Sequence, residues 1–138
     1  MPKEQAPIPS VLVFLLCDQV IQEMGTNKKS LIGLFDRAWA AQFPAAWGPF
    51  WIFAKMTDGE GEYKFRVEVV KPETEKIVGR VDTPAAQIAD RLTGIDLALR
   101  IPVITFEEPG IYEFNLSSND VWIARTALNV QLQTKESK

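Results

Sequence analysis

Hydrophobic and polar residues alternate along much of the chain, and this pattern predicts an all-β fold. The clearest alternation runs over 63–69, where every second residue is apolar. The same period of two recurs over 95–99, 112–116 and 128–132. Successive side chains of a strand point to opposite faces, so each segment is expected to turn one face to the core and one to water.

A nearly unbroken hydrophobic segment, 10–20, behaves differently and predicts a strand that is covered on both faces. A polar turn at 25–29 separates it from a second strand at 30–35, so the two are expected to form an antiparallel hairpin. The alternative for 11–17 is a signal peptide, but its apolar run is short and no small-residue cleavage site follows. We therefore favour a buried strand.

The end of the chain predicts a second hairpin, with strands at 111–116 and 121–132 and a turn at 117–120. It opens with Glu108-Pro109-Gly110-Ile111-Tyr112, a turn and strand start found in many immunoglobulin-like and C2-like domains. Tyr112 is expected at a sheet corner, bonded to the backbone. The fold class predicted is an immunoglobulin-like or C2-like β-sandwich of seven to nine antiparallel strands, with a small barrel as the alternative.

The segment 84–91 is the one helix-like stretch, with Thr83 as its cap and Pro84 in its first turn. It predicts one short loop helix. The predicted organisation is a flexible arm at 1–9, a single domain at 10–133 and a polar tail at 134–138.

Composition excludes several classes of function. The 138 residues include no histidine and one cysteine, which excludes His-dependent acid–base and triad chemistry, His-ligated metals and an intrachain disulfide. The net charge is -3, with no basic stripe for nucleic acid and no apolar stretch long enough to span a membrane. The sequence predicts a non-enzymatic protein with no cofactor and no nucleic-acid or membrane partner. A reducing, cytoplasmic compartment fits the single thiol.

The cysteine and the acidic residues that could form a reactive or calcium-binding site are better explained by structural roles. Cys17 has no His partner and an adjacent carboxylate, Asp18, so it is expected to be a small buried hydrophobe. Asp18, Glu23 and Asp36, or the acidic segment 58–62, offer oxygens for Ca²⁺, but no calcium-binding spacing is present. Weak calcium binding therefore stays open as an alternative.

The four tryptophans are the most unusual feature, because three of them fall within thirteen residues around a proline-bracketed loop. Three explanations compete: cover by a loop at 38–48 or 84–91, a contact with a protein partner or second copy, and a sugar-stacking platform. The candidate interface consists of Trp39, Trp47, Phe50, Trp51, Phe53 and Trp122.

Three motifs together resemble an uncharacterised family of small bacterial proteins, of planctomycete type. They are Cys17-Asp18, Ser30-Leu31-Ile32-Gly33 and Pro109-Gly110-Ile111-Tyr112, within residues 10–133. The resemblance implies a β-sandwich and a bacterial source, and it implies no activity.

The function predicted from these observations is a protein-interaction or assembly module that acts through an apolar sheet face or an edge strand, with a protein partner or as a homo-oligomer. The alternative is a β-sandwich that binds a small ligand or carbohydrate through surface aromatics.

Overall fold

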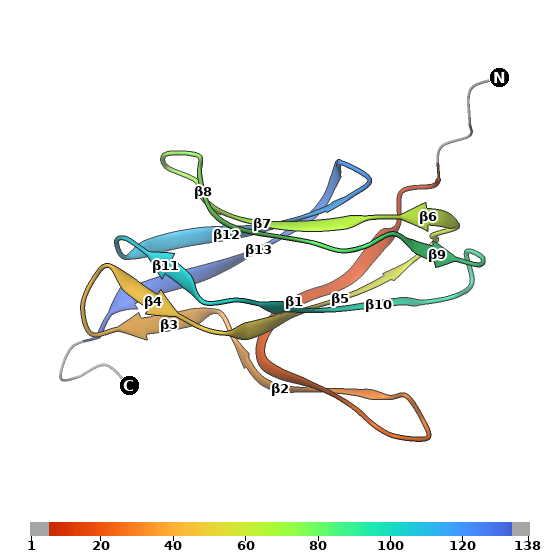
Figure 1. Cartoon of the computed structure of the whole chain (residues 1–138), viewed down its shortest axis with the longest axis horizontal. Coiled ribbons are helices and arrows are strands. Elements are labelled where there is room, and N and C mark those ends of the chain that lie inside the picture. The colour runs from red at the N-terminus through yellow and green to blue at the C-terminus, as the bar shows by residue number, and fades with distance from the viewer. Residues whose placement is uncertain (1–5, 134–138) are drawn as a thin grey trace.

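The computed structural model describes residues 6–133, which form two larger sheets and two short strand pairs (Figure 1). The four-stranded sheet has the order β10-β5-β1-β2 and comprises β10 (Ile95–Ile101), β5 (Phe50–Thr57), β1 (Ser10–Gln22) and β2 (Lys29–Phe35). The five-stranded sheet has the order β3-β13-β12-β7-β8 and comprises β3 (Arg37–Ala40), β13 (Val121–Leu132), β12 (Gly110–Ser118), β7 (Phe65–Lys71) and β8 (Lys76–Asp82). The short pairs are β11 (Ile104–Phe106) with β4 (Ala45–Trp47), and β6 (Gly61–Tyr63) with β9 (Ala86–Ile88).

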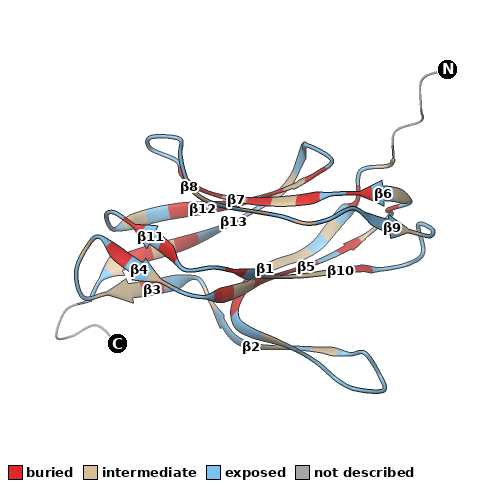
Figure 2. Ribbon diagram, in the orientation of Figure 1, coloured by how far each residue is buried: buried red, intermediate tan, exposed pale blue. Residues whose placement is uncertain are grey.

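The two larger sheets pack face to face around one hydrophobic core, as the buried positions between the layers in Figure 2 show. The alternation predicted for 63–69 is confirmed, because Tyr63, Phe65, Val67 and Val69 are all buried. From the other sheet, Ile52 and Met56 of β5 enter the same core. The rings of Phe50 and Phe114 meet across the layers with centroids 5.7 Å apart.

Both predicted hairpins are confirmed. β1 pairs antiparallel with β2, and β12 pairs antiparallel with β13. The second hairpin turns at Asn119 and Asp120, whose φ angles of 48° and 67° are both positive. Two such residues in a row are the mark of a type I′ turn, whose twist matches that of the flanking strands.

The all-β prediction is confirmed, but several finer expectations were wrong. The segment predicted as a loop helix instead forms β9 and a turn, and residues 6–133 contain no helix. A two-turn helix has too few internal hydrogen bonds to be stable by itself, so pairing of Ala86–Ile88 with β6 prevails. The described part of the chain has thirteen strands rather than seven to nine, and the sheets do not close into a barrel.

One strand pair departs from the expected antiparallel arrangement. β3 runs parallel to β13, with Ala38 beside Val130. The chain reaches this edge directly from β2, which belongs to the other sheet, so it crosses between the layers at Asp36. No membrane-spanning helix is found among the described residues.

The described end of the predicted arm is held against the domain. The Tyr63 hydroxyl donates a 2.6 Å hydrogen bond to the carbonyl oxygen of Pro7, and Pro9 is buried. Residues 1–5 of the arm and the predicted tail, 134–138, lie outside the described residues.

Candidate functional site

The predicted interface residues lie in several different places. Phe50 is 1% exposed and belongs to the core of a single chain. Half-buried Trp47 packs against it with ring centroids 5.0 Å apart, and both contact the ring of Phe35. The loop at 38–48 therefore brings Trp47 over the end of the core, which is the first of the three explanations for the tryptophan excess.

The other tryptophans are distributed over both outer surfaces. Trp39 and Trp122 belong to β3 and β13 of the five-stranded sheet. Trp39 pairs with Gln131, nine residues along β13 from Trp122, which is roughly 30 Å at the rise of a strand. Trp122 is 57% exposed, and its indole Nε1 donates to Asn115 at 3.0 Å. These two rings therefore do not form a common platform.

Trp51 and Phe53 lie on the outer face of the four-stranded sheet, the face turned away from the core. Their β5 neighbours Phe50, Ile52 and Ala54 point into the core, so alternation directs these two side chains outward. Across the strands, Phe53 is opposite Leu15 and Ala98, and Trp51 is opposite Cys17 and Arg100. These register pairs form continuous rows across the sheet.

We define the outer patch as Leu15, Leu34, Trp51 and Phe53. Leu34 joins it because it pairs with Cys17 in the Trp51 row. Leu34 is 58% exposed and Leu15 is 37% exposed, whereas Trp51 is half-buried and Phe53 is only 8% exposed, so the two leucines present most of the patch's apolar surface to solvent. Cys17 lies beneath the patch with no exposure, as expected for a small hydrophobe, and burial raises the pKa of its thiol.

The β1–β2 hairpin curls beneath this outer face (Figure 1). Near its tip, Lys29 lies 3.4 Å from Asp96 of β10, although β1 and β5 separate the two strands in the sheet. Lys55 of β5 reaches the other carboxylate oxygen at 3.0 Å. Burial raises the pKa of Asp96, but the hydrogen bonds and charges of the two lysines outweigh it and hold the pKa below its usual value.

A cleft of about 560 Å³ lies between the hairpin and the sheet, with Leu31 and Phe53 among its lining residues. Its lysines at 29 and 55 already share one carboxylate, Asp96. The arrangement closes part of the outer face and fixes the hairpin to the sheet.

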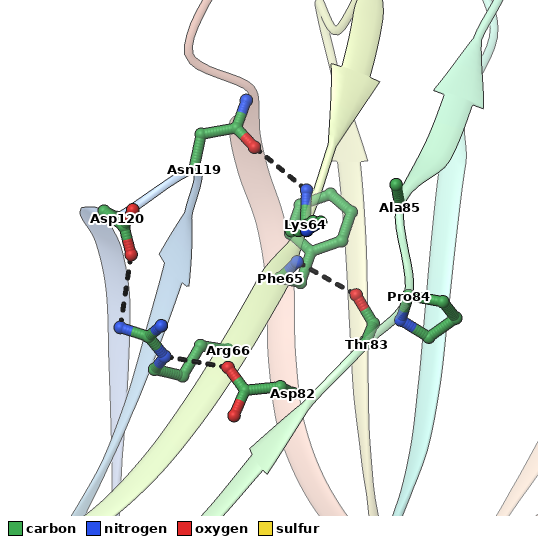
Figure 3. A pocket seen from close by; sticks show the side chains of 9 residues that line it. All are labelled: Lys64, Phe65, Arg66, Asp82, Thr83, Pro84, Ala85, Asn119 and Asp120. Carbon is green, nitrogen blue, oxygen red and sulfur yellow. Dashed lines mark hydrogen bonds and ion pairs between the residues drawn. The ribbon is translucent and has the colours of Figure 1, made fainter.

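A cleft of about 780 Å³ lies beside the turn that joins β12 to β13 (Figure 3). Arg66 stands between Asp82, at 2.8 Å, and Asp120, at 3.2 Å. Arg80 also binds Asp82, and the hydrogen bonds of the two arginines hold the pKa of that carboxyl below its usual range. Arg66, Asp82 and Asp120 are therefore paired with one another.

The backbone lining this cleft is also bonded. The Lys64 amide donates to Asn119 Oδ1 and the Phe65 amide donates to Thr83 Oγ1, each at 2.9 Å (Figure 3). Asn119 Nδ2 donates in turn to the Glu62 carbonyl oxygen at 3.0 Å. The two bonds of Asn119 fix the type I′ turn to residues 62 and 64, and the bond of Thr83 joins the residue after β8 to β7, so all three contacts have a structural role.

An apolar cleft of about 410 Å³ opens at one edge of the molecule, between β10 and the segment that leads into β9. Leu97 and Leu99 of β10 line it together with Pro84 and Ile88. Both leucines are only half-buried, although they point to the core side of their sheet. The space between the two layers is therefore incompletely filled at this edge.

The carboxylates considered for calcium do not gather. Asp18 is exposed within β1 and Asp36 is exposed directly after β2, and within residues 6–133 no three acidic or sulfur side chains are close enough to hold a metal ion. The acidic segment 58–62 forms a turn and the start of β6.

Sequence reasoning missed one buried ionic group. Lys71 is 7% exposed, pairs with Glu108, and lies 5.4 Å from the centroid of the Tyr112 ring. The hydrogen bond with Glu108 raises the pKa of this lysine. Its position at the end of an alternating strand, in phase with Val67 and Val69, was the available signal.

The chain belongs to a family of unknown function, DUF6941, whose model matches residues 12–131. This match covers nearly the whole domain and agrees with the expected uncharacterised family. No curated protein matches the chain.

Proposed function

We propose that this protein is a non-enzymatic interaction or assembly module that binds a protein partner through the outer patch of its four-stranded sheet. The observation that carries the proposal is the contrast between the molecule's two outer faces. The five-stranded sheet turns mostly charged and polar side chains outward, namely Arg66, Glu68, Glu113, Asn115 and Arg125, and its one exposed tryptophan, Trp122, is hydrogen-bonded to Asn115. The four-stranded sheet turns outward a row of Leu15, Phe53 and Ala98, of which Leu15 is exposed, Ala98 is half-buried and Phe53 is covered.

This contrast favours a partner because antiparallel sheets usually turn polar side chains to water on their uncovered face. Apolar patches that stand out from the rest of a surface mark interaction sites. Trp51 adds a large, rigid side chain with few rotatable bonds, the type enriched at the centres of protein interfaces.

Two further elements of the proposal concern fold class and setting. The bond from the Tyr112 hydroxyl to Glu108, at the start of a late strand, supports an immunoglobulin-like relationship. The single buried thiol supports the reducing cytoplasm, in a bacterial cell, as the place where the module works.

Site-specific photo-crosslinking tests the proposal. A photoreactive phenylalanine analogue replaces Leu34 in cells that naturally express the protein, and a matched control carries it at Glu68 on the opposite outer face. We expect one defined protein to be captured from position 34 and not from position 68, and Leu15→Lys should abolish capture. Equal capture at both positions, or none at 34, would contradict the proposal.

A further inference from the structure

β10 is an edge strand that lacks the usual protection against pairing with another strand. It ends the four-stranded sheet, and its seven residues pair with β5 without a register shift. The other edges differ: β3 has only four residues, β8 has a register shift where it pairs with β7, and β2 contains Gly33 at φ +70°. Short length, bulges and kinks are the devices that keep edge strands from associating.

The sequence of β10 is nearly a palindrome. It reads Ile95-Asp96-Leu97-Ala98-Leu99-Arg100-Ile101, so isoleucines and leucines are placed symmetrically about Ala98 and the two charges are opposite in sign. In an antiparallel pair of two such strands centred on Ala98, each leucine is opposite a leucine. Asp96 of each strand is then opposite Arg100 of the other.

This charge arrangement selects one register and direction. Parallel self-pairing in register would set Asp96 opposite Asp96 and Arg100 opposite Arg100, which is unfavourable. Antiparallel pairing centred on Leu99 would set Asp96 opposite Pro102, which has no amide hydrogen to donate. Centring on Ala98 pairs all seven residues.

The charged groups involved are available for this contact. Arg100 is exposed and makes no ion pair among the described residues. Lys29 and Lys55 each take a different oxygen of Asp96, and a carboxylate accepts about four hydrogen bonds, so acceptor capacity remains. Exposed ion pairs of this kind fix register rather than supply affinity.

The apolar cleft provides the driving force. Leu97 and Leu99 are half-buried at its mouth, beside Pro84 and Ile88. A strand added at the β10 edge would place its own core-side leucines next to these two and remove them from water. Burial of these leucines supplies the hydrophobic free energy for association, which an edge strand with polar side chains on both faces would lack.

We propose that a second copy of this chain pairs antiparallel with the free edge of β10, on a two-fold axis at Ala98. The inference goes beyond the proposed function, because it concerns the edge of the four-stranded sheet and not the outer patch. The two sheets would join into one of eight strands (Figure 1 shows β10 at the edge), with an outer patch on each side of the axis.

Complementary charge reversal tests the register. Arg100→Asp sets two acidic residues opposite each other in its homodimer, and Asp96→Arg sets two arginines opposite each other. In sedimentation experiments we expect the wild-type mass to be twice 15.5 kDa, each variant alone to fall to 15.5 kDa, and an equimolar mixture to recover the dimer. Arg37→Asp, on β3, is the matched control and should stay dimeric.

A wild-type chain that stays monomeric up to its solubility limit would overturn the inference, as would variants that remain dimeric alone. A second measurement does not depend on charge. Ala98→Cys should cross-link to itself with a short bis-maleimide, whereas Arg80→Cys on the β8 edge should not; equal cross-linking at both positions would also overturn it.

Failure of this inference and failure of the proposed function give different results. Capture from position 34 by a monomeric protein would remove the self-pairing and leave the proposed function intact. Dimerisation through β10 without any capture at position 34 would support the self-pairing and contradict the proposed function.

Discussion

The hydroxyl of Tyr112 donates a 2.6 Å hydrogen bond to the carbonyl oxygen of Glu108, four residues earlier in the chain. The bond spans the Pro109-Gly110 turn and fixes the point at which β12 enters the core. Tyr112 is 1% exposed, and its ring packs on Phe106 with centroids 4.6 Å apart. The side chain of Glu108 holds Lys71 over the same ring, so one turn orders three elements.

Tyr112→Phe is expected to lower the free energy of unfolding by about 1 kcal/mol, because it removes one hydrogen bond and keeps the packing of the ring. Denaturant unfolding measures the change. Tyr112→Leu, which also removes ring contacts, should cost more than Tyr112→Phe. Equal stability of the wild type and Tyr112→Phe would show that the corner bond contributes nothing.

The close contact between Asp18 of β1 and Gly33 of β2 predicts a steric effect of substitution at Gly33. Gly33 has a φ of +70°, and a β-carbon added there would lie 2.7 Å from Asp18 Cγ. Gly25→Ala is the matched control, because Gly25 also has a positive φ, +89°, but nothing lies within 4 Å of the added carbon. The control should cost about 1 kcal/mol of stability, the backbone contribution alone.

Gly33→Ala should cost more than this control, since the Asp18 side chain must also move. Adding Asp18→Ala to Gly33→Ala should recover the excess and leave a cost like that of Gly25→Ala. If the single and double variants unfold at the same denaturant concentration, Asp18 is not the obstacle.

Acid should destabilise the protein through three carboxylates whose pKa values are lowered in the folded state, Asp82, Asp90 and Asp96. A lowered folded pKa means that the unfolded chain binds protons more readily. The stabilisation is therefore complete above the unfolded pKa, about 3.9, and is lost as the pH falls through the folded values. Thermal unfolding between pH 6 and 2 measures this loss.

Asp82→Asn should reduce the slope of stability against pH in the acid range, because it removes the carboxylate that Arg66 and Arg80 share. Glu75→Gln, at an exposed turn, should leave the slope unchanged and serves as the control. An unchanged slope for Asp82→Asn would contradict the assignment.

Much of the fold follows from local sequence signals, because alternation and turn residues act over a few neighbours. The strand at 63–69 and both hairpins were predicted on that basis. The helix at 84–91 was predicted from a cap and a proline alone. It is absent because the competing interaction, pairing of Ala86–Ile88 with β6, involves residues distant in the chain.

The candidate site was harder to predict for the same reason. Composition showed more aromatic residues than one core needs, but it could not show which of them are buried in the core. Phe50 and Trp51 are adjacent in sequence, yet one is in the core and the other on the outer face, and only the register of β5 decides between them. The palindrome of β10 was readable in the sequence, but its meaning depends on β10 being an edge strand.

Trp47 and Trp51 should therefore respond to substitution in different ways. Trp47 packs on Phe35 and Phe50 within one chain, so Trp47→Ala should lower the free energy of unfolding by about 2 kcal/mol, less than for a fully buried aromatic residue. Trp51 faces outward, so Trp51→Ser should cost less stability and should weaken capture of a partner from position 34. Paired denaturant unfolding and crosslinking measure both effects. The opposite result would be that Trp47→Ala keeps full stability but loses capture, while Trp51→Ser captures normally. That result would place the partner contact at the loop that carries Trp47 and not on the outer face of the sheet.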